Sequence, residues 1–162
     1  MPSKGNLASL QAYVQALRAV GKGGARRVSR ALSNKAKALV DEGFARGMAP
    51  NGAAWAPLKV RSGQPLRDTR QLQNSTLPVD AGRGFRISSA VHHGDVHQRG
   101  ATIQAKGRTL YSRKLNMAFG KSVTISARPF LPREGNLPAR WQTGLDEAAR
   151  EAIARMLKGA GG

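Results

Sequence analysis

The sequence predicts an α+β fold with two N-terminal helices, a small, mainly antiparallel sheet with long loops, and a C-terminal helix. Apolar residues recur at helical spacing near both ends of the chain, and short alternating segments lie between them. Frequent Pro and Gly residues interrupt 48–67. One domain is expected over 1–158, with a helical part at 6–47, a loop and sheet part at 48–131 and a helix at about 138–158, followed by a flexible tail at 159–162.

The N-terminal helices follow from apolar periodicity. In residues 7–20 the apolar positions fall on one face, and glycines at 21, 23 and 24 end this first helix. The second helix is expected from about 26 to 47. Its apolar stripe consists of Leu32, Ala36, Leu39, Val40 and Phe44.

The segment 48–67 is too rich in turn-forming residues for a long helix or strand. Irregular segments of this length usually form binding loops or are disordered. Trp55 favours an ordered loop. The spacing of residues 68–71 (Asp-Thr-Arg-Gln) is typical of a capping box and predicts one or two helical turns.

Short strands are expected next. Residues 77–79 and 85–87 alternate on either side of a Gly-rich turn and predict a hairpin, whose first strand lies at an edge because it contains Pro78. Residues 96–100 predict a short helical turn, 103–115 are only weakly patterned, and 123–127 predict a further strand. The stripe of the C-terminal helix consists of Ala149, Ala152, Ile153, Met156 and Leu157.

The composition predicts a thin core and a strongly basic surface. The chain has 162 residues, with 27 Lys and Arg against 9 Asp and Glu and a formal net charge of +18. Leu, Ile, Val and Phe make up 32 of the 162 residues, which is close to the limit for burying a stable core. We therefore expect contact with neighbouring subunits, with a polyanion, or with both to complete the fold.

Several classes of protein are disfavoured. The absence of Cys excludes disulfides, thiolate metal sites and a Cys nucleophile. No apolar run is long enough to cross a bilayer, and no secretory signal is recognisable. We therefore expect that the protein does not associate with membranes. We also expect that it is synthesised in a reducing cytoplasm.

The positive charge is concentrated in two blocks. Residues 1–40 and 96–133 contain no carboxylate, whereas Lys and Arg are frequent in both. Such blocks attract nucleic acid through the release of counterions, although a solvated basic surface without a partner is the alternative. Aromatic residues are only 5% of the chain, which argues against stacking on bases. Non-specific contact with nucleic acid is favoured.

One cluster suggests metal binding or catalysis. His93, Asp95 and His97 have the ligand types of a facial metal site, but no helix or strand register aims them at one point. A structural role for His97 is favoured. The sequence shows no paired carboxylates, no Ser-His-Asp set and no phosphate-binding glycine motif, so we expect no enzymatic activity, no metal and no cofactor.

An ordered set of short motifs extends from the second helix over about residues 40–132. It consists of Phe44, Pro50-Asn51-Gly52, Trp55-Ala56-Pro57-Leu58-Lys59, Gly63-Gln64-Pro65-Leu66, Asp68-Thr69-Arg70-Gln71-Leu72, Ser75, Val96-His97-Gln98-Arg99-Gly100 and Ala127-Arg128-Pro129-Phe130-Leu131. In this order the set resembles the phage virion morphogenesis family, the tail-completion proteins of the phage Mu G and phage P2 S type. Arg70, Gly94 and Asp95 depart from the family pattern, and residues 104–122 do not align with it.

The resemblance implies a non-enzymatic structural virion protein at the head-proximal end of a phage tail, where it completes the tail and helps to join it to the head. It implies a homo-oligomeric ring around the DNA exit channel, in contact with head connector or neck proteins, with tail terminator or tail tube proteins and non-specifically with packaged DNA. The expected location is the virion tail or neck, after assembly in the host cytoplasm. The alternative is a small basic protein that binds nucleic acid without sequence specificity.

Two sets of site residues follow from these expectations. The candidates for a subunit interface are Trp55, Pro57, Leu58, Leu66, Phe130 and Leu131. The candidates for facing DNA are Arg99, Lys106, Arg108, Arg113, Lys114 and Lys121. For Trp55 two roles are open and compatible: a large aromatic side chain can pack the loop onto the core, and it can anchor a neighbouring subunit.

Overall fold

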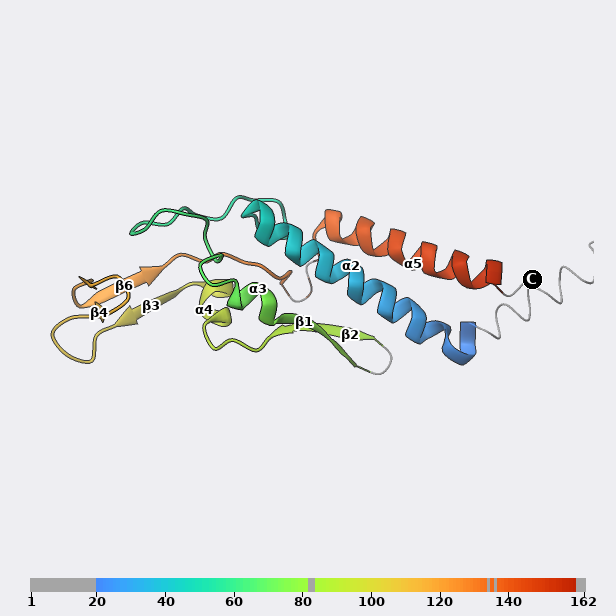
Figure 1. Ribbon diagram of the computed structural model, residues 1–162, viewed down its shortest axis with the longest axis horizontal. Helices are drawn as coiled ribbons and strands as arrows, with labels where there is room; N and C mark the ends of the chain where they lie inside the picture. The colour runs from blue at the N-terminus through green and yellow to red at the C-terminus, as the bar shows by residue number, and fades with distance from the viewer. Residues whose placement is uncertain (1–19, 82–83, 134, 136, 160–162) are drawn as a thin grey trace, which may run out of the picture. The chain divides into compact units, whose positions relative to one another are not determined.

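The computed structural model describes residues 20–81, 84–133, 135 and 137–159 (Figure 1). Its elements are η1 (Val20–Gly24), α2 (Ala25–Arg46), α3 (Gln71–Ser75), β1 (Thr76–Asp80), β2 (Phe85–Ser89), α4 (Gly94–Arg99), β3 (Ala101–Gln104), β4 (Tyr111–Ser112), β5 (Met117–Ala118), β6 (Ser122–Ile125) and α5 (Ala139–Gly159). The strands form three two-stranded sheets, β1–β2, β3–β6 and β4–β5. The α+β class, the small antiparallel β-structure and the C-terminal helix are confirmed.

The expected helices correspond to the structure where it describes them. The second N-terminal helix is α2, and the C-terminal helix is α5. The first N-terminal helix lies almost entirely outside the described residues, and so do tail residues 160–162. The Gly-rich joint forms η1, a turn that is kinked at the non-helical Gly23 and leads directly into α2.

The chain divides into two compact units. Among the described residues, unit 1 comprises 20–39, 77–81, 84–88 and 139–159, and unit 2 comprises 40–76, 89–133, 135 and 137–138. The expectation of one domain stays a prediction. None of the helices that the structure describes combines the length and apolar character that a membrane span requires.

In unit 1, α5 lies alongside the first part of α2 (Figure 1). Gly144 faces α2 at this contact, where a Cβ would lie 2.9 Å from Lys35 Cε, the far end of a flexible side chain, and 3.6 Å from Leu39 Cδ1. Ala36 and Leu39 of the predicted α2 stripe are buried, as are Trp141 and Ala152 of α5. The helical periodicity therefore identified the buried face of α2. The predicted stripe of α5 is wrong in part, because Ala152 is buried but Ile153 and Leu157 are 40% and 36% exposed.

The predicted hairpin of unit 1 is also present. β1 and β2 are joined by a short connection, in which Ala81 N donates to Gly84 O at 3.0 Å, and such a connection joins antiparallel strands only. Leu77 and Val79 of β1 are 51% and 46% exposed, so the hairpin leaves much of its apolar surface uncovered.

In unit 2, residues 47–70 form the irregular loop that the sequence predicted, and the structure shows how it begins. Gly47 reverses the chain at the end of α2 with a φ of 67°. Gln64 Nε2 donates to Phe44 O at 2.7 Å, a carbonyl at the end of a helix that has no partner in the next turn. Trp55 N donates to Gly47 O at 2.9 Å. The loop is thus anchored to the end of α2.

The expected short helix is present as α3, but its expected capping box is wrong. The residue before α3 is Arg70, which has a φ of 56° and makes no side-chain capping hydrogen bond. Asp68 instead forms an ion pair with Lys114. The carboxylate is therefore used for a tertiary contact, which local spacing does not reveal.

The predicted helical turn at 96–100 is α4, and a strand pair follows it. Gly100 ends the helix with a φ of 77°, and a Cβ there would lie 3.0 Å from Ala127 N and Ile125 O, so only glycine fits. β3 pairs with β6 from Ala101↔Ile125 to Gln104↔Ser122. β4 pairs with β5 in the segment of the chain that connects β3 to β6. We call residues 101–125 the β-arm.

The sequence predicted only β6 within the β-arm. Three of the four residues of β3 are exposed, so the strand has no buried face that would impose alternation of apolar and polar residues. Cross-strand hydrogen bonds hold the arm instead, including Ala105 N to Lys121 O at 2.8 Å and Leu110 N to Gly120 O at 2.7 Å. Patterns of hydrophobicity cannot detect such strands.

Candidate functional site

Three aromatic side chains from distant segments pack together in unit 2. Phe44 of α2 is 0% exposed, and its ring lies 5.4 Å from the ring of Trp55 and 5.7 Å from that of Phe130. Trp55 and Phe130 are themselves 6% and 5% exposed. Ring pairs at such separations stabilise a core beyond their buried area. We call Phe44, Trp55 and Phe130 the aromatic cluster.

Polar contacts fasten the irregular loop of residues 47–70, which we call the Trp55 loop, to residues 128–129. Trp55 Nε1 donates to Pro129 O at 2.7 Å. The buried Arg128 donates from Nε to Ala56 O at 2.8 Å and from Nη2 to Pro57 O at 2.9 Å. Hydrogen bonds from a charged donor are stronger than neutral ones, so this guanidinium holds the loop in place.

Gln98 of α4 binds the same segment from another side. Its Nε2 donates to Leu131 O at 2.7 Å, and its Oε1 accepts from Phe130 N at 3.0 Å and Leu131 N at 3.1 Å. Arg128 N donates to His97 O at 2.7 Å. Four of the ordered motifs, at Phe44, 55–59, 96–100 and 127–131, therefore meet around the aromatic cluster.

The six interface candidates fall into two groups. Trp55 and Phe130 are buried within the aromatic cluster, which for Trp55 corresponds to the core role. Pro57 is exposed, and the other three are partly exposed: Leu58, Leu66 and Leu131. These four leave surface for a neighbouring subunit, and their interface role stays a prediction.

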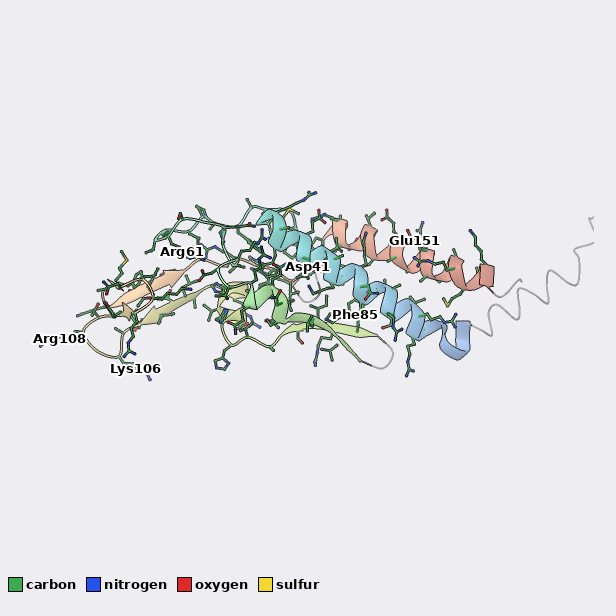
Figure 2. The ribbon with its side chains drawn as sticks, viewed as in Figure 1. Asp41, Arg61, Phe85, Lys106, Arg108 and Glu151 are labelled. Atoms are coloured by element: carbon green, nitrogen blue, oxygen red, sulfur yellow. The ribbon has the colours of Figure 1, made fainter. Side chains whose placement is uncertain are left out.

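Five of the six DNA-facing candidates lie on the β-arm, and all five are exposed: Lys106, Arg108, Arg113, Lys114 and Lys121. Figure 2 shows Lys106 and Arg108 at the end of the arm farthest from α4. Lys114 is engaged in its ion pair with Asp68. The sixth candidate, Arg99, lies on α4 and pairs with Asp95 at 2.9 Å. The arm thus groups four exposed cations for which the described residues provide no ion-pair partner.

The histidine cluster is not arranged as a metal centre. Within the described ranges, no group of three or more His, Cys, Asp or Glu side chains is placed to hold an ion. Asp95 is directed to Arg99, whereas the rings of His93 and His97 lie edge to face at 5.6 Å. Burial, followed by the proximity of His93 and Arg128, lowers the pKa of the His97 imidazole. Protonation of His97 is therefore disfavoured in the folded protein.

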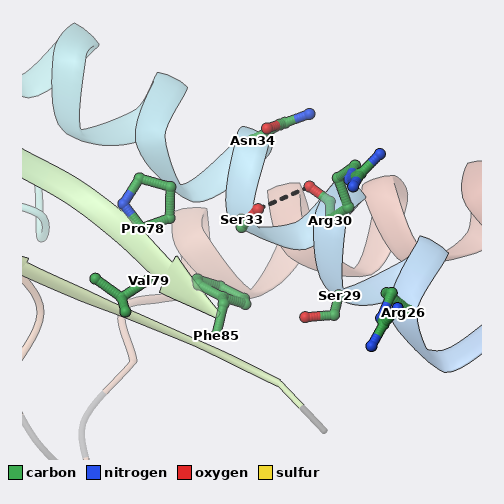
Figure 3. Close-up of a pocket in the computed structure, with 8 residues that line it drawn as sticks. All are labelled: Arg26, Ser29, Arg30, Ser33, Asn34, Pro78, Val79 and Phe85. Carbon is green, nitrogen blue, oxygen red and sulfur yellow. Dashed lines mark hydrogen bonds between the residues drawn. The ribbon is translucent and has the colours of Figure 1, made fainter. Parts of the chain in front are cut away.

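A hollow of about 430 Å³ lies in unit 1 between α2 and the β1–β2 hairpin (Figure 3). Its α2 side carries Arg26 and Arg30, and its hairpin side carries Phe85. The Ser33 hydroxyl donates to Arg30 O at 2.9 Å. The described lining contains no carboxylate or imidazole, so this hollow offers positive charge without an acid–base pair.

Sequence reasoning missed the structural roles of Gln98 and Arg128. Both residues lie inside the ordered motifs, and this position was the sequence feature that could have indicated a structural role. A single Gln or Arg in a motif does not reveal that its side chain will bind backbone carbonyls of a distant loop. Their roles became visible only when the tertiary contacts were known.

A comparison with curated proteins and another with solved structures give no match. The phage virion morphogenesis family matches residues 6–160. This range includes every motif around the aromatic cluster and also the β-arm. The chain therefore belongs to the phage virion morphogenesis family.

Proposed function

We propose that this protein is a non-enzymatic structural subunit at the head-proximal end of a phage tail, where it completes the tail, joins it to the head and forms part of a ring around the DNA exit channel. Membership of the family gives it a role in phage virion assembly, and that membership is the observation that carries the proposal. Two features of the described structure support the proposal. The aromatic residues of the motifs are buried in a core, and the exposed cations of the β-arm suit a channel that carries DNA.

The test is a phage or phage-like particle whose copy of this gene is disrupted. Electron microscopy is expected to show filled heads and separate tails that do not join, and purified protein added to the extract should restore joined particles. Labelled protein should then be located between head and tail. Normally joined particles in the complete absence of the protein would overturn the proposal.

The second candidate function is non-specific binding of nucleic acid by the isolated protein, which the exposed cations of the β-arm favour. This function predicts tight binding to duplex DNA by a monomer, with a slope of about −0.9 in log affinity against log salt for each phosphate neutralised. Weak DNA binding by a protein that assembles into tails would support the structural role instead.

A further inference from the structure

A second hollow, in unit 2, gathers positive charge without balancing it. It has a volume of about 380 Å³ and lies between the Trp55 loop, α4 and the β-arm. We call it the cationic hollow, and its charged or titratable lining consists of Arg61, Asp68, His93, His97, Lys114 and Arg128. Asp68 is the single carboxylate in this described lining, and it is already paired with Lys114.

The cations of the hollow are held close enough to repel one another. Burial and then the charge of Arg61 lower the pKa of the Arg128 guanidinium. Burial, followed by the proximity of His93 and Arg128, in turn disfavours a charge on His97. Because arginine keeps its charge, Arg61 and Arg128 leave a net positive potential that an anion from outside would relieve. His97 Nδ1 is buried and has no hydrogen-bond partner among the described residues.

The walls of the hollow suit a carboxylate carried on a protein side chain. Leu58, Leu66 and Leu72 line it together with the cations. The aliphatic stem of an acidic residue packs favourably against leucines, whereas a nucleic-acid backbone has no apolar stem to place there. A phosphate polymer is also better served by the open row of cations on the β-arm. The hollow therefore favours an acidic side chain of a protein.

This chain itself carries acidic residues that lack a partner. Among the carboxylates whose side chains are described, Asp146 and Glu147 alone take part in no ion pair or hydrogen bond. Both are exposed near the start of α5. The same helix leaves Ile153 and Leu157 40% and 36% exposed. α5 thus presents unpaired negative charge and uncovered apolar side chains together.

We propose that the cationic hollow of one copy binds the side chains of Asp146 and Glu147 on α5 of the next copy. The two surfaces are different, so the contact is heterologous, and contacts of this kind close into rings when the rotation between copies allows it. The inference rests on the proposed ring and specifies which surfaces build it. Leu58 and Leu66, two of the interface candidates, become part of this contact.

A charge-reversal experiment tests the pairing. Sedimentation velocity measures self-association of the full chain, and Arg61→Glu is expected to weaken it by at least about tenfold, as is Glu147→Arg, because each leaves like charges facing one another. The double variant Arg61→Glu/Glu147→Arg should associate more strongly than either single variant. Lys158→Glu, an exposed reversal at the far end of the same helix, is the matched control and should resemble the natural protein.

The cysteine-free sequence allows a second, direct measurement. Copies with Arg61→Cys are mixed with copies carrying Glu147→Cys and oxidised, and disulfide-linked dimers are expected. Lys158→Cys, at the other end of α5, replaces Glu147→Cys in the control mixture and should give few dimers. This readout survives even if a charge reversal unfolds the protein.

The outcomes separate the inference from the proposed function. A natural protein that associates, with neither reversal changing its association and no specific cross-link, would overturn the inference and leave the ring intact. Loss of association by Arg61→Glu without recovery in the double variant would assign the hollow to a different acidic partner and also overturn it. A natural protein that remains monomeric and enters no tail would overturn both.

Discussion

The aromatic cluster and the β-arm belong to the same unit but differ in burial and in the contacts that hold them together. In the cluster, Phe44, Trp55 and Phe130 are almost completely buried and polar side chains bind the surrounding backbone. In the β-arm, Ile103, Tyr111 and Met117 are 41%, 57% and 43% exposed, and the strands are held by their own hydrogen bonds. The sequence motifs therefore mark the part of unit 2 that packs its core, while the exposed apolar side chains of the β-arm lie outside these motifs.

The largest expected effect comes from removing the centre of the cluster. Phe44→Ala is expected to lower the free energy of unfolding by about 3–5 kcal/mol, because it opens a cavity between two rings. Tyr111→Ala, an aromatic truncation on the β-arm, is expected to change it by less than about 0.5 kcal/mol. Urea denaturation followed by circular dichroism measures both.

Phe44→Leu provides a measurable case if Phe44→Ala does not fold. It keeps much of the apolar volume, and the expected loss is about 1–1.5 kcal/mol. Similar losses for Tyr111→Ala and Phe44→Leu would show that the arm is as important to stability as the cluster, contrary to the comparison above.

The next effect concerns the amide that binds the Phe130 segment. Gln98→Ala leaves the N–H groups of Phe130 and Leu131 without their acceptor, and the expected loss is about 2–3 kcal/mol. Gln98→Glu keeps an acceptor but removes the donor to Leu131 O, so its loss should be smaller. Gln104→Ala on the β-arm is the matched control. Thermal unfolding of the natural protein and the three variants gives their order of stability. A Gln98→Ala variant as stable as the natural protein would contradict the prediction.

A smaller effect depends on pH. The pKa of His97 is lowered from its ordinary value of 6.5, and the groups around it are His93, Arg61, Arg128 and Lys114, with the paired Asp68. The unfolded state therefore binds a proton more readily, so stability is full above pH 6.5 and declines as the pH falls below it. His97→Gln should flatten this decline, whereas His92→Gln, at an exposed position, should not. Parallel stability curves for all three proteins would contradict the prediction.

The smallest effect on stability is expected at the end of the arm. Lys106→Ser/Arg108→Ser/Lys121→Ser should change the unfolding free energy by less than about 0.5 kcal/mol. It should reduce the slope of log DNA affinity against log salt by up to about 3, at close to one phosphate per cation. Lys59→Ser/Arg150→Ser/Lys158→Ser removes the same charge elsewhere and is the control. Equal reductions by both triple variants would show that total charge, and not the arm, governs DNA contact.

Much of the fold could be predicted because helices and buried stripes follow local periodicity. α2, α5, the β1–β2 hairpin and the stop at Gly100 are all visible in the sequence. The β-arm strands were invisible, apart from β6, since an exposed ladder needs no apolar alternation. The candidate site divides in the same way. The exposed cations of the arm were identified from composition, but the hollow around Arg61 and Arg128 requires contacts between loops that no spacing encodes.

The exposed loops of the β-arm also have a practical consequence. Lys106, Arg108 and Arg113 lie in turns or irregular connections outside the paired strands, which is where proteases gain access to a folded chain. Brief digestion with trypsin should therefore nick this excursion before it reaches the buried Arg128. The rate of that first cut reports whether the arm is covered, and it can be followed in crude particle extracts without purifying any partner.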